Sequence, residues 1–296
     1  MRFGLRSFET SGKQRGLWTD AFRRYRRNKG AMLGMVLLLL IVFAAIMAPW
    51  ITKYSPFKQR IRDALSPPSA SHILGTDHLG RDLFARIIYG ARTSLKVGSI
   101  ATGIACCIGI PLGLVSGYYS GWLDTIMMRL VDILLAFPGM LLALAIMAIL
   151  GPSLSNAMFA AGVYIIPDYV RVARASTLAV REMDYVVSAR AIGCPSWYTI
   201  QRHIFPNVLL PLIVLASLNL ASTILFVAGL SFLGMGAQPP TAEWGIMLKD
   251  GRLYLRQAWW PAVFPGLALL ISLLAINMVG EGLRNALDPR GLARGR

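Results

Sequence analysis

Stretches without a charged residue constrain the fold of this chain more than any other feature. The first covers residues 31–51, which is 21 residues. As an α-helix it would be about 30 Å long, the thickness of the hydrocarbon core of a bilayer. Backbone groups in that core have no water to pair with, so such a segment must be helical. The chain is therefore predicted to be an all-α polytopic membrane protein.

Six membrane-spanning helices are expected. The uncharged stretch around residues 133–167 is too long for one helix and contains the turn signal Gly151-Pro152-Ser153, so two helices are placed there. The fifth helix is expected to start after Pro206 and Asn207. The expected spans are residues 31–51, a segment within 97–123, and then 130–150, 154–178, 208–236 and 261–280.

The composition agrees with a membrane location. Hydrophobic residues make up 55% of the chain and charged residues 15%, whereas soluble domains carry about 25% charged residues. The formal net charge of +16 would by itself suit a nucleic-acid-binding protein. Nine of the Lys and Arg residues, however, precede residue 31, and others border the later apolar stretches. Membrane proteins distribute their basic residues in this way, so no nucleic acid partner is expected.

The basic residues also predict the orientation. If the N-terminus is cytoplasmic, 19 of the 30 Lys and Arg residues fall in inner segments, in agreement with the positive-inside rule. The basic region before residue 31 is too long for a cleaved signal peptide, so a retained signal-anchor is expected. This orientation gives a cytoplasmic segment 1–30, a transmembrane domain 31–282, a cytoplasmic tail 283–296, outer loops 54–92 and 237–260, and an inner loop 179–206.

No catalytic or metal site is predicted. Cys106 and Cys107 are adjacent and Cys194 is distant, so the cysteines suit neither a disulfide nor a metal site. An intramembrane enzyme needs a nucleophile and a base within the helices. The three histidines lie in expected loops, and residues 229–233 read GLSFL rather than GxSxG. The segment SGK at 11–13 lacks the upstream glycine of a phosphate-binding loop. The chain is therefore not expected to be an enzyme.

The inner loop has the most informative sequence, REMDYVVSARAIGCPSWYTIQRHIFPN at residues 181–207. Residues 182–192 favour a helix, and Gly193 suits the position that follows a helix end. The small residues at positions 188, 189 and 191 would let another protein approach closely. One face of this helix is expected to contain Tyr185, Ser188, Ala189 and Ile192.

A second short helix is expected after this glycine corner. Pro195 suits its first turn, and Pro206 is expected to close it. Its apolar stripe would consist of Trp197, Ile200, Ile204 and Phe205. Two short helices joined in this way would form a protruding, partly apolar elbow on the inner face. The alternative is an ordinary amphipathic loop that lies on the membrane.

The pattern SARAIG, followed by nine residues and HIFP, resembles the signature loop of bacterial ABC importer permeases. In that family this loop is the coupling helix, which docks into a cleft on a cytoplasmic ATPase. By position, Ser188 and Ala189 match the small pair of the pattern, and Gly193 matches its glycine. Phe205 and Pro206 match the closing dipeptide.

The chain departs from that pattern at one position. The family loop often begins with Glu, whereas this chain has Val187, so no salt bridge to the ATPase is expected from that site. Neighbouring charged residues would supply the polar contacts instead. The resemblance thus implies an ATPase-coupling site that contains Arg181, Glu182, Asp184, Tyr185, Ser188, Ala189, Arg190, Ala191, Gly193, Phe205 and Pro206.

Other segments extend the resemblance over about residues 23–290. In order and spacing they resemble the dipeptide, oligopeptide and nickel permease subfamily, in particular its shorter C-type subunit. The resemblance implies the type I importer permease fold in a bacterial inner membrane. The implied partners are a second permease, two cytoplasmic ATPases and an extracytoplasmic peptide-binding protein. ATP and Mg²⁺ would be bound by the ATPases, and this chain would hold no cofactor. The segments are RNKGAMLG at 27–34, GTDHLGRDLFARIIYGARTSL at 75–95, FLGMGAQPPTAEWGIML at 232–248 and GEGLRNALDPR at 280–290.

Residues 75–95 are predicted to form an amphipathic helix at the outer interface. Asp77 would cap this helix, and Asp82 would pair with Arg81 or Arg86. The helix would either anchor the second span or contact a partner protein.

Charges within the spans and aromatic residues outside them are given structural roles. Asp132 is expected to pair with Arg129, and Asp168 with Arg171. The outer loop 237–260 would either form an interfacial aromatic belt or offer a gate or docking surface. Its belt residues are Trp244, Trp259 and Trp260.

The expected function is half of a translocation pathway for di- or oligopeptides, driven by partner ATPases. Nickel or another small solute stays open as the cargo, because specificity can reside in the binding protein. A stand-alone channel or secondary carrier is the other alternative, and co-purification with an ATPase would distinguish it.

Overall fold

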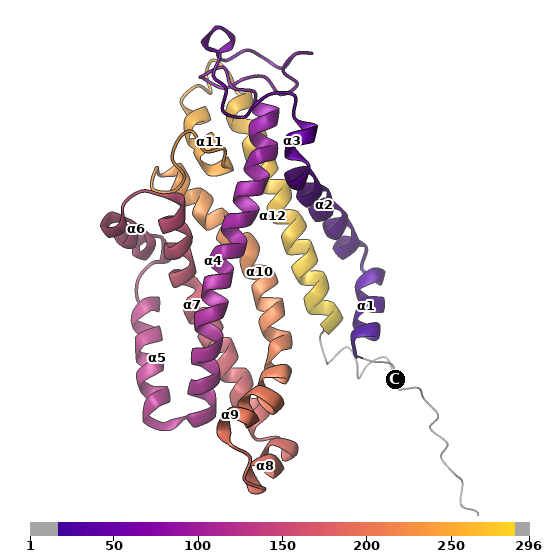
Figure 1. The fold of residues 1–296 in the computed structure, drawn as a ribbon, viewed down its shortest axis with the longest axis vertical. Helices are drawn as coiled ribbons and strands as arrows, with labels where there is room; N and C mark the ends of the chain where they lie inside the picture. Colours follow the sequence, from indigo (N-terminus) through magenta and orange to yellow (C-terminus); the bar gives the residue numbers. More distant parts are fainter. Residues whose placement is uncertain (1–16, 288–296) are drawn as a thin grey trace, which may run out of the picture.

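The computed structural model describes residues 17–287, and the regular elements in this part of the chain are helices (Figure 1). The expected segment 1–30 and tail 283–296 therefore lie partly outside the described residues. The elements are α1 (Leu17–Arg27), α2 (Lys29–Ile46), α3 (Ala48–Ile51), the 3₁₀-helix η1 (Ile61–Asp63), α4 (Leu83–Tyr119), α5 (Gly121–Leu135), α6 (Gly139–Leu150), α7 (Leu154–Arg181), α8 (Asp184–Ala191), α9 (Ser196–Thr199), the π-helix η2 (Ile200–Ile204), α10 (Phe205–Phe232), α11 (Trp244–Arg252) and α12 (Trp260–Leu287).

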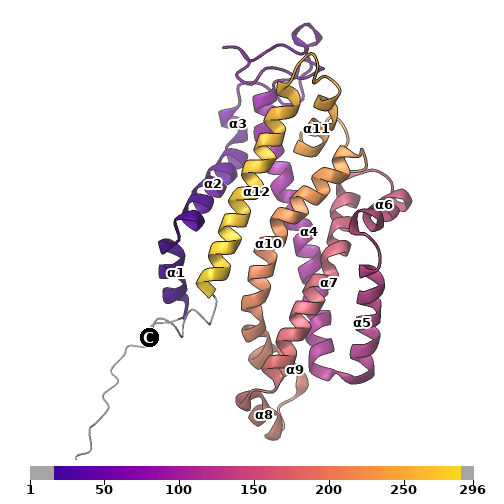
Figure 2. The same ribbon diagram turned by 180° about the vertical axis from the view of Figure 1, so that it is seen from behind.

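The long helices account for the six expected crossings. Four helical segments in the described chain are long and apolar enough to span a bilayer: α2, α4, the continuous segment from α9 to α10, and α12. The bent pair α5–α6 counts as a fifth. α7 contains Arg171 and Arg174, but at 28 residues it is also long enough. It lies beside α4 in both views (Figures 1 and 2), so it passes through the same layer.

The third span is not the single helix that was expected at 130–150. α5 ends at Leu135 and α6 starts at Gly139, and the two helices meet at 90°. Pro138 lies in the break. Proline has no N–H to donate, and it disfavours the helical conformation of the preceding Phe137. Hydropathy could not predict this break, because the residues on both sides of it are apolar.

The outer loop is shorter than expected. It ends at Asp82 rather than at residue 92, because α4 begins at Leu83 and runs for 37 residues without interruption. This length corresponds to about 55 Å. The predicted interfacial helix at 75–95 is thus wrong: its second half is the outer end of the spanning helix itself.

Asp82, not Asp77, caps α4. Its carboxylate accepts a hydrogen bond from the Ala85 N–H at 2.8 Å and also contacts His72 Nδ1 at 2.8 Å. Asp77 instead pairs with Arg81 at 2.6 Å and with Arg86 at 3.5 Å. The expected pairing of Asp82 with Arg81 or Arg86 is therefore wrong, although the charges do neutralise one another within this buried cluster.

The pairs expected within the spans also differ. Asp132 contacts Arg171 of α7 at 2.7 Å rather than Arg129 of its own helix. Arg174 forms two hydrogen bonds with Asp124, of 2.5 and 2.7 Å. The actual pairs join α5 to α7 and are therefore tertiary contacts, which helical spacing within one segment could not reveal.

Small residues allow α4 and α7 to pack closely. Gly109, Gly113 and Gly117 recur every four residues on α4, and each lies against α7. A Cβ added at Gly113 would lie only 2.5 Å from the Ala173 Cβ. Small residues at this spacing are the usual means by which membrane helices approach closely.

Tryptophans of the outer region hold it onto the bundle. Trp244 is 1% exposed, and its indole N–H donates to the Ile87 carbonyl at 3.1 Å. Trp260 is also buried and donates to the Thr76 carbonyl. Only Trp259 of the three predicted belt residues is exposed. The belt interpretation is thus wrong for Trp244, which fixes α11 to α4, and for Trp260, which fixes the start of α12 to the outer loop.

Glu243 caps α11 from a buried position. Its two carboxylate oxygens accept hydrogen bonds from the Gly245 and Ile246 N–H groups at 2.8 and 3.0 Å. Burial raises the pKa of Glu243, and these hydrogen bonds offset only part of that effect. Because burial penalises the charged form, the folded state is favoured most when the carboxyl group of Glu243 is protonated.

This raised pKa predicts how stability depends on pH. Since the folded state binds the proton more tightly, the stabilisation is complete below the ordinary pKa of a glutamate and is lost as the pH rises through the folded value. The Glu243→Gln variant lacks this titration. We expect the Tm of the wild type, measured relative to that of the variant, to rise when the pH falls from about 8 to about 5. A Tm difference that stays constant or moves the other way would contradict the assignment.

Candidate functional site

The candidate site is the protruding pair α8 and α9, which lies at the lower end of the molecule (Figures 1 and 2). The loop between α3 and α4, together with α11, lies at the opposite end. α1 and the end of α12 point toward the same half as the pair, and Tyr25, Ala31 and Ala286 pack together there. We call residues 182–204 the elbow.

The elbow turns at Gly193, as its sequence predicts. Gly193 has φ of +84°, a conformation that suits glycine. The Cys194 N–H donates to the Ala189 carbonyl at 3.1 Å, and the Gly193 N–H donates to the Arg190 carbonyl at 3.0 Å. These two hydrogen bonds form a Schellman motif, which ends α8 and satisfies its last carbonyl groups.

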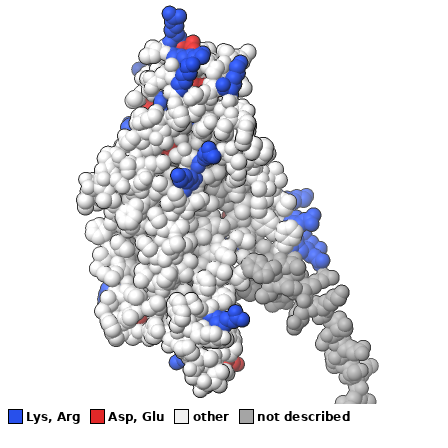
Figure 3. All heavy atoms as spheres, in the orientation of Figure 1, with Lys and Arg blue, Asp and Glu red and all other residues white. Residues whose placement is uncertain are grey.

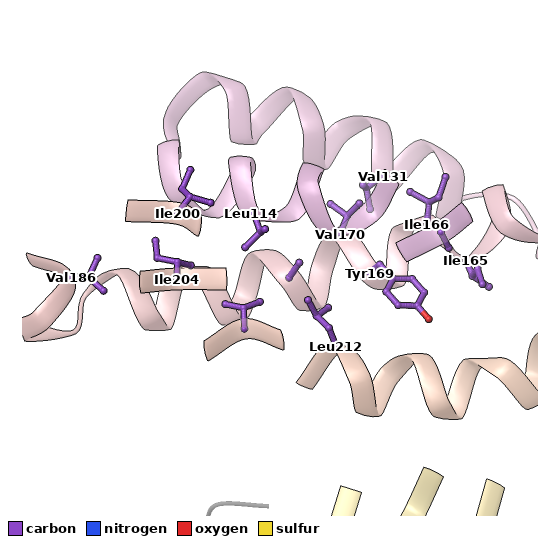
Figure 4. Packing of buried hydrophobic residues seen from close by; sticks show 13 residues of the cluster. Leu114, Val131, Ile165, Ile166, Tyr169, Val170, Val186, Ile200, Ile204 and Leu212 are labelled. Carbon is purple, nitrogen blue, oxygen red and sulfur yellow. The ribbon is translucent and has the colours of Figure 1, made fainter. Parts of the chain in front are cut away.

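The inner face of the elbow belongs to the hydrophobic core of the bundle. Val186 and Ile204 are fully buried, and Ile200 is 6% exposed. They share one cluster with Leu114 of α4 and Val170 of α7 (Figure 4). The elbow is therefore fixed to the membrane helices by apolar packing.

Aromatic rings connect the two arms of the elbow. The His203 ring lies 5.8 Å from the Tyr198 ring and 6.4 Å from the Tyr185 ring, measured between centroids. These three residues come from α9, η2 and α8, so they join both arms of the elbow.

The outer face of the elbow exposes large apolar side chains. Ile192 at the corner is 82% exposed and Trp197 is 68% exposed. Large apolar side chains exposed on one short protruding segment indicate an interaction surface. We call this group the apolar patch; its members are Met183, Tyr185, Val187, Ile192, Trp197 and Tyr198.

Two predicted features of the elbow are wrong. Ala189 is 6% exposed and packs inward, so it offers no surface for close approach by another protein. Pro206 does not close a helix, because η2 continues directly into α10. The Phe205 N–H donates to the Ile200 carbonyl, five residues back, and this wider π turn accommodates the proline that follows.

The charged residues of the predicted site divide into two groups. Arg181 points into the protein, where it donates to the Gly117 and Tyr118 carbonyls at the end of α4 and pairs with Glu182 at 2.8 Å. A cation at this position complements the helix C-terminus. The other polar or small members of the predicted set are exposed: Glu182, Asp184, Ser188, Arg190, Ala191, Gly193 and Pro206. Phe205 is half-buried.

Of the six members of the apolar patch, the predicted site contained only Tyr185. Ile192 and Trp197 were expected on apolar stripes, and Val187 was regarded only as a departure from a pattern. Two large hydrophobic residues on either side of a glycine corner were the available signal. A protruding corner cannot bury the side chains on both of its sides, so at least one of these two residues had to be exposed.

The fold is that of the membrane subunits of ABC importers. A chain of the MetNI methionine ABC transporter, in an inward-facing crystal structure, has a TM-score of 0.57 with this chain. The two are 17% identical, and the similarity covers 69% of this chain and 97% of that one. The likeness therefore concerns the architecture.

The chain belongs to the family of binding-protein-dependent transport system inner membrane components, whose model matches residues 109–291. Residues 16–68 match the N-terminal TM domain of oligopeptide transport permease C. The dipeptide transport system permease protein DppC of Escherichia coli K12 is 48% identical over 90% of this chain and 91% of that protein. The di/tripeptide transport system permease protein DppC of Pseudomonas aeruginosa is 46% identical over 92% and 91%. The DppC protein of Alkalihalophilus pseudofirmus is 44% identical over 92% and 90%.

Proposed function

We propose that this chain forms half of the translocation pathway of an ABC importer for di- or oligopeptides. Three relatives at 44–48% identity carry dipeptide or di/tripeptide transport in their names. Their similarity extends over at least 90% of this chain, and so includes both the spans and the elbow. Nickel or another small solute is the competing cargo for the same architecture.

The apolar patch is the single observation that supports coupling to a partner ATPase. A monomer gains nothing by exposing Ile192 and Trp197 to water at the tip of a protruding elbow. Their burial in a cleft of another protein would favour docking by roughly 1.5–3 kcal/mol for each large side chain. The exposed charges of Asp184 and Arg190 would lie at the rim of that contact.

The helix after the corner would transmit the motion of the elbow. α9, η2 and α10 form one continuous helical segment, Ser196–Phe232, of 37 residues. Its length of about 55 Å extends from the elbow to the far half of the bundle. Closure of the ATPases would push the elbow, tilt this helix and open the pathway to the outside, as expected of alternating access by rocking.

The remaining assignments follow from this arrangement. The chain would lie in a bacterial inner membrane with both termini and the elbow in the cytoplasm. A second permease would complete the pathway, two ATPases would bind ATP and Mg²⁺, and a binding protein would deliver the peptide outside. This chain would act as a transport subunit without an ATPase site of its own.

Polar substitution of the apolar patch tests the coupling. In the Ile192→Ser/Trp197→Ser variant we expect the ATPase to co-purify with the permeases at less than about one tenth of the wild-type yield, because two large apolar groups are lost from the contact. The Tm of the isolated permease pair should change little, since both side chains are exposed. Leu253→Ser, which changes a 73% exposed residue at the opposite end, is the matched control. Normal ATPase recovery and uptake in the elbow variant would refute the coupling role.

Uptake by the reconstituted complex tests the cargo. We expect proteoliposomes that contain both permeases, both ATPases and the binding protein to accumulate a labelled dipeptide in an ATP-dependent manner. Excess unlabelled dipeptide should abolish the signal, and excess Ni²⁺ should not. Nickel accumulation without peptide accumulation would replace the proposed cargo with the competing one.

A further inference from the structure

Two basic residues of α4 stand out because they are exposed and unpaired. Arg92 and Lys96 are one helical turn apart on the same face, and both are exposed. Within residues 17–287 neither forms an ion pair; the acidic residues that do are paired elsewhere. Arg171 and Arg174 of α7, by contrast, each have a carboxylate of α5 within 4.0 Å.

Packing against α2 places Arg92 inside the membrane layer. Ile88 and Ala91, directly before Arg92, line a cavity with Ile41 and Ala44 of α2. These α2 residues lie about 15–20 Å along the uncharged stretch that begins at residue 31, within a layer about 30 Å thick. Arg92 follows them toward the membrane centre, because α4 runs from the outer end inward.

Packing against α10 gives the same depth from the other side. Gly98, two residues after Lys96, lies against Leu220 and Ile224. Leu220 and Ile224 lie 12 and 8 residues before the end of α10 at Phe232, which corresponds to about 18 and 12 Å along the helix. Two neighbouring helices therefore place Lys96 and Arg92 within the apolar layer, in its outer half, with Arg92 one turn nearer the outer end.

Such a position excludes contact with lipid. A charged side chain at the centre of a spanning helix costs roughly 2.5–3.5 kcal/mol on insertion scales, and residues of this kind face a protein interior or a water-filled cavity. Figure 3 shows one basic patch in the otherwise uncharged middle of the face that α4 crosses in Figure 1. This face must therefore adjoin water or another subunit.

The rest of the face agrees with contact to water. Below Lys96, small residues follow at helical spacing: Ser99, Gly103 and Cys107. Ser99 and Cys107 are exposed, and a Cβ added at Gly103 would meet nothing within 4 Å. The neighbouring exposed positions on α4, Ile100 and Ile108, are apolar. One narrow stripe of α4 thus consists of two basic residues followed by small residues, and apolar residues lie beside it.

We propose that this stripe lines the translocation pathway and that Arg92 and Lys96 bind the C-terminal carboxylate of a peptide in transit. The inference rests on the proposed peptide import and specifies how the cargo is recognised. A guanidinium binds a carboxylate through two parallel hydrogen bonds, and an adjacent ammonium adds a third donor. The same two charges repel a free Ni²⁺ ion, so the stripe favours a peptide cargo over a cation.

Uptake of matched peptides tests carboxylate recognition. The assembled complex is given a dipeptide as the free acid or as the C-terminal amide, and kcat/KM is measured for each. We expect Arg92→Gln/Lys96→Gln to lower the acid-to-amide ratio of kcat/KM at least about tenfold, the loss expected for one hydrogen bond to a charged group. The charge-conserving Arg92→Lys/Lys96→Arg variant should recover most of the ratio. Arg62→Gln, which removes an exposed charge in the outer loop, should leave it unchanged.

The outcomes separate this inference from the proposed function. If the wild-type complex takes up neither peptide, the proposed cargo is wrong. If the wild type transports both and the Gln variant keeps the wild-type ratio, carboxylate recognition is overturned. A lower yield of the second permease with the Gln variant, while the complex that remains keeps the wild-type ratio, would show that Arg92 and Lys96 pair with an acidic residue of that subunit instead.

Access to water is tested on the same face. In an otherwise cysteine-free complex, we expect a membrane-impermeant thiol reagent to modify Ser99→Cys. It should spare Leu40→Cys, whose position on α2 is 58% exposed within an apolar stretch. An anionic reagent should react faster than a cationic one with Ser99→Cys, and this preference should disappear in the Arg92→Gln/Lys96→Gln background. Equal protection of both cysteines would refute the pathway assignment.

Discussion

The apolar contact between the elbow and the membrane helices is the constraint on which the rest of the structure depends. Val186 and Ile204 are fully buried against α4 and α7. With its inner face fixed there and its corner set by Gly193, the elbow has no means of burying Ile192 and Trp197 as well. The same packing that positions the elbow therefore leaves an apolar surface for a partner, and a continuous helical segment joins the elbow to α10.

The charges of the long helices fall into two classes with different consequences. Asp124 and Asp132 of α5 are paired with arginines of α7, and these pairs hold a broken span beside a continuous one. Arg92 and Lys96 have no such partner in the described chain and lie at the depth of apolar neighbours. The paired charges serve the architecture, and the unpaired ones indicate where the architecture must be open to water or to another subunit.

Much of the fold could be predicted from the sequence, because uncharged stretches of membrane length have one possible secondary structure. The break at Pro138 could not be predicted, since hydropathy does not show where an apolar helix bends. The length of α4 could not be predicted either, since hydropathy does not show that a polar segment continues a helix. In the site, Gly193 was predictable from the rarity of its backbone conformation for other residues. Ala189 was placed outside because spacing alone does not distinguish the buried face of a short helix from the exposed one.

The sidedness of Ile192 tests the central claim most directly. A cysteine at this exposed corner, in an otherwise cysteine-free permease, can be labelled with an impermeant reagent in right-side-out and in inside-out membrane vesicles. A cytoplasmic elbow predicts labelling only in inside-out vesicles, and protection there when the ATPase subunits are bound. Labelling in right-side-out vesicles would place the elbow outside the cell and would contradict the account.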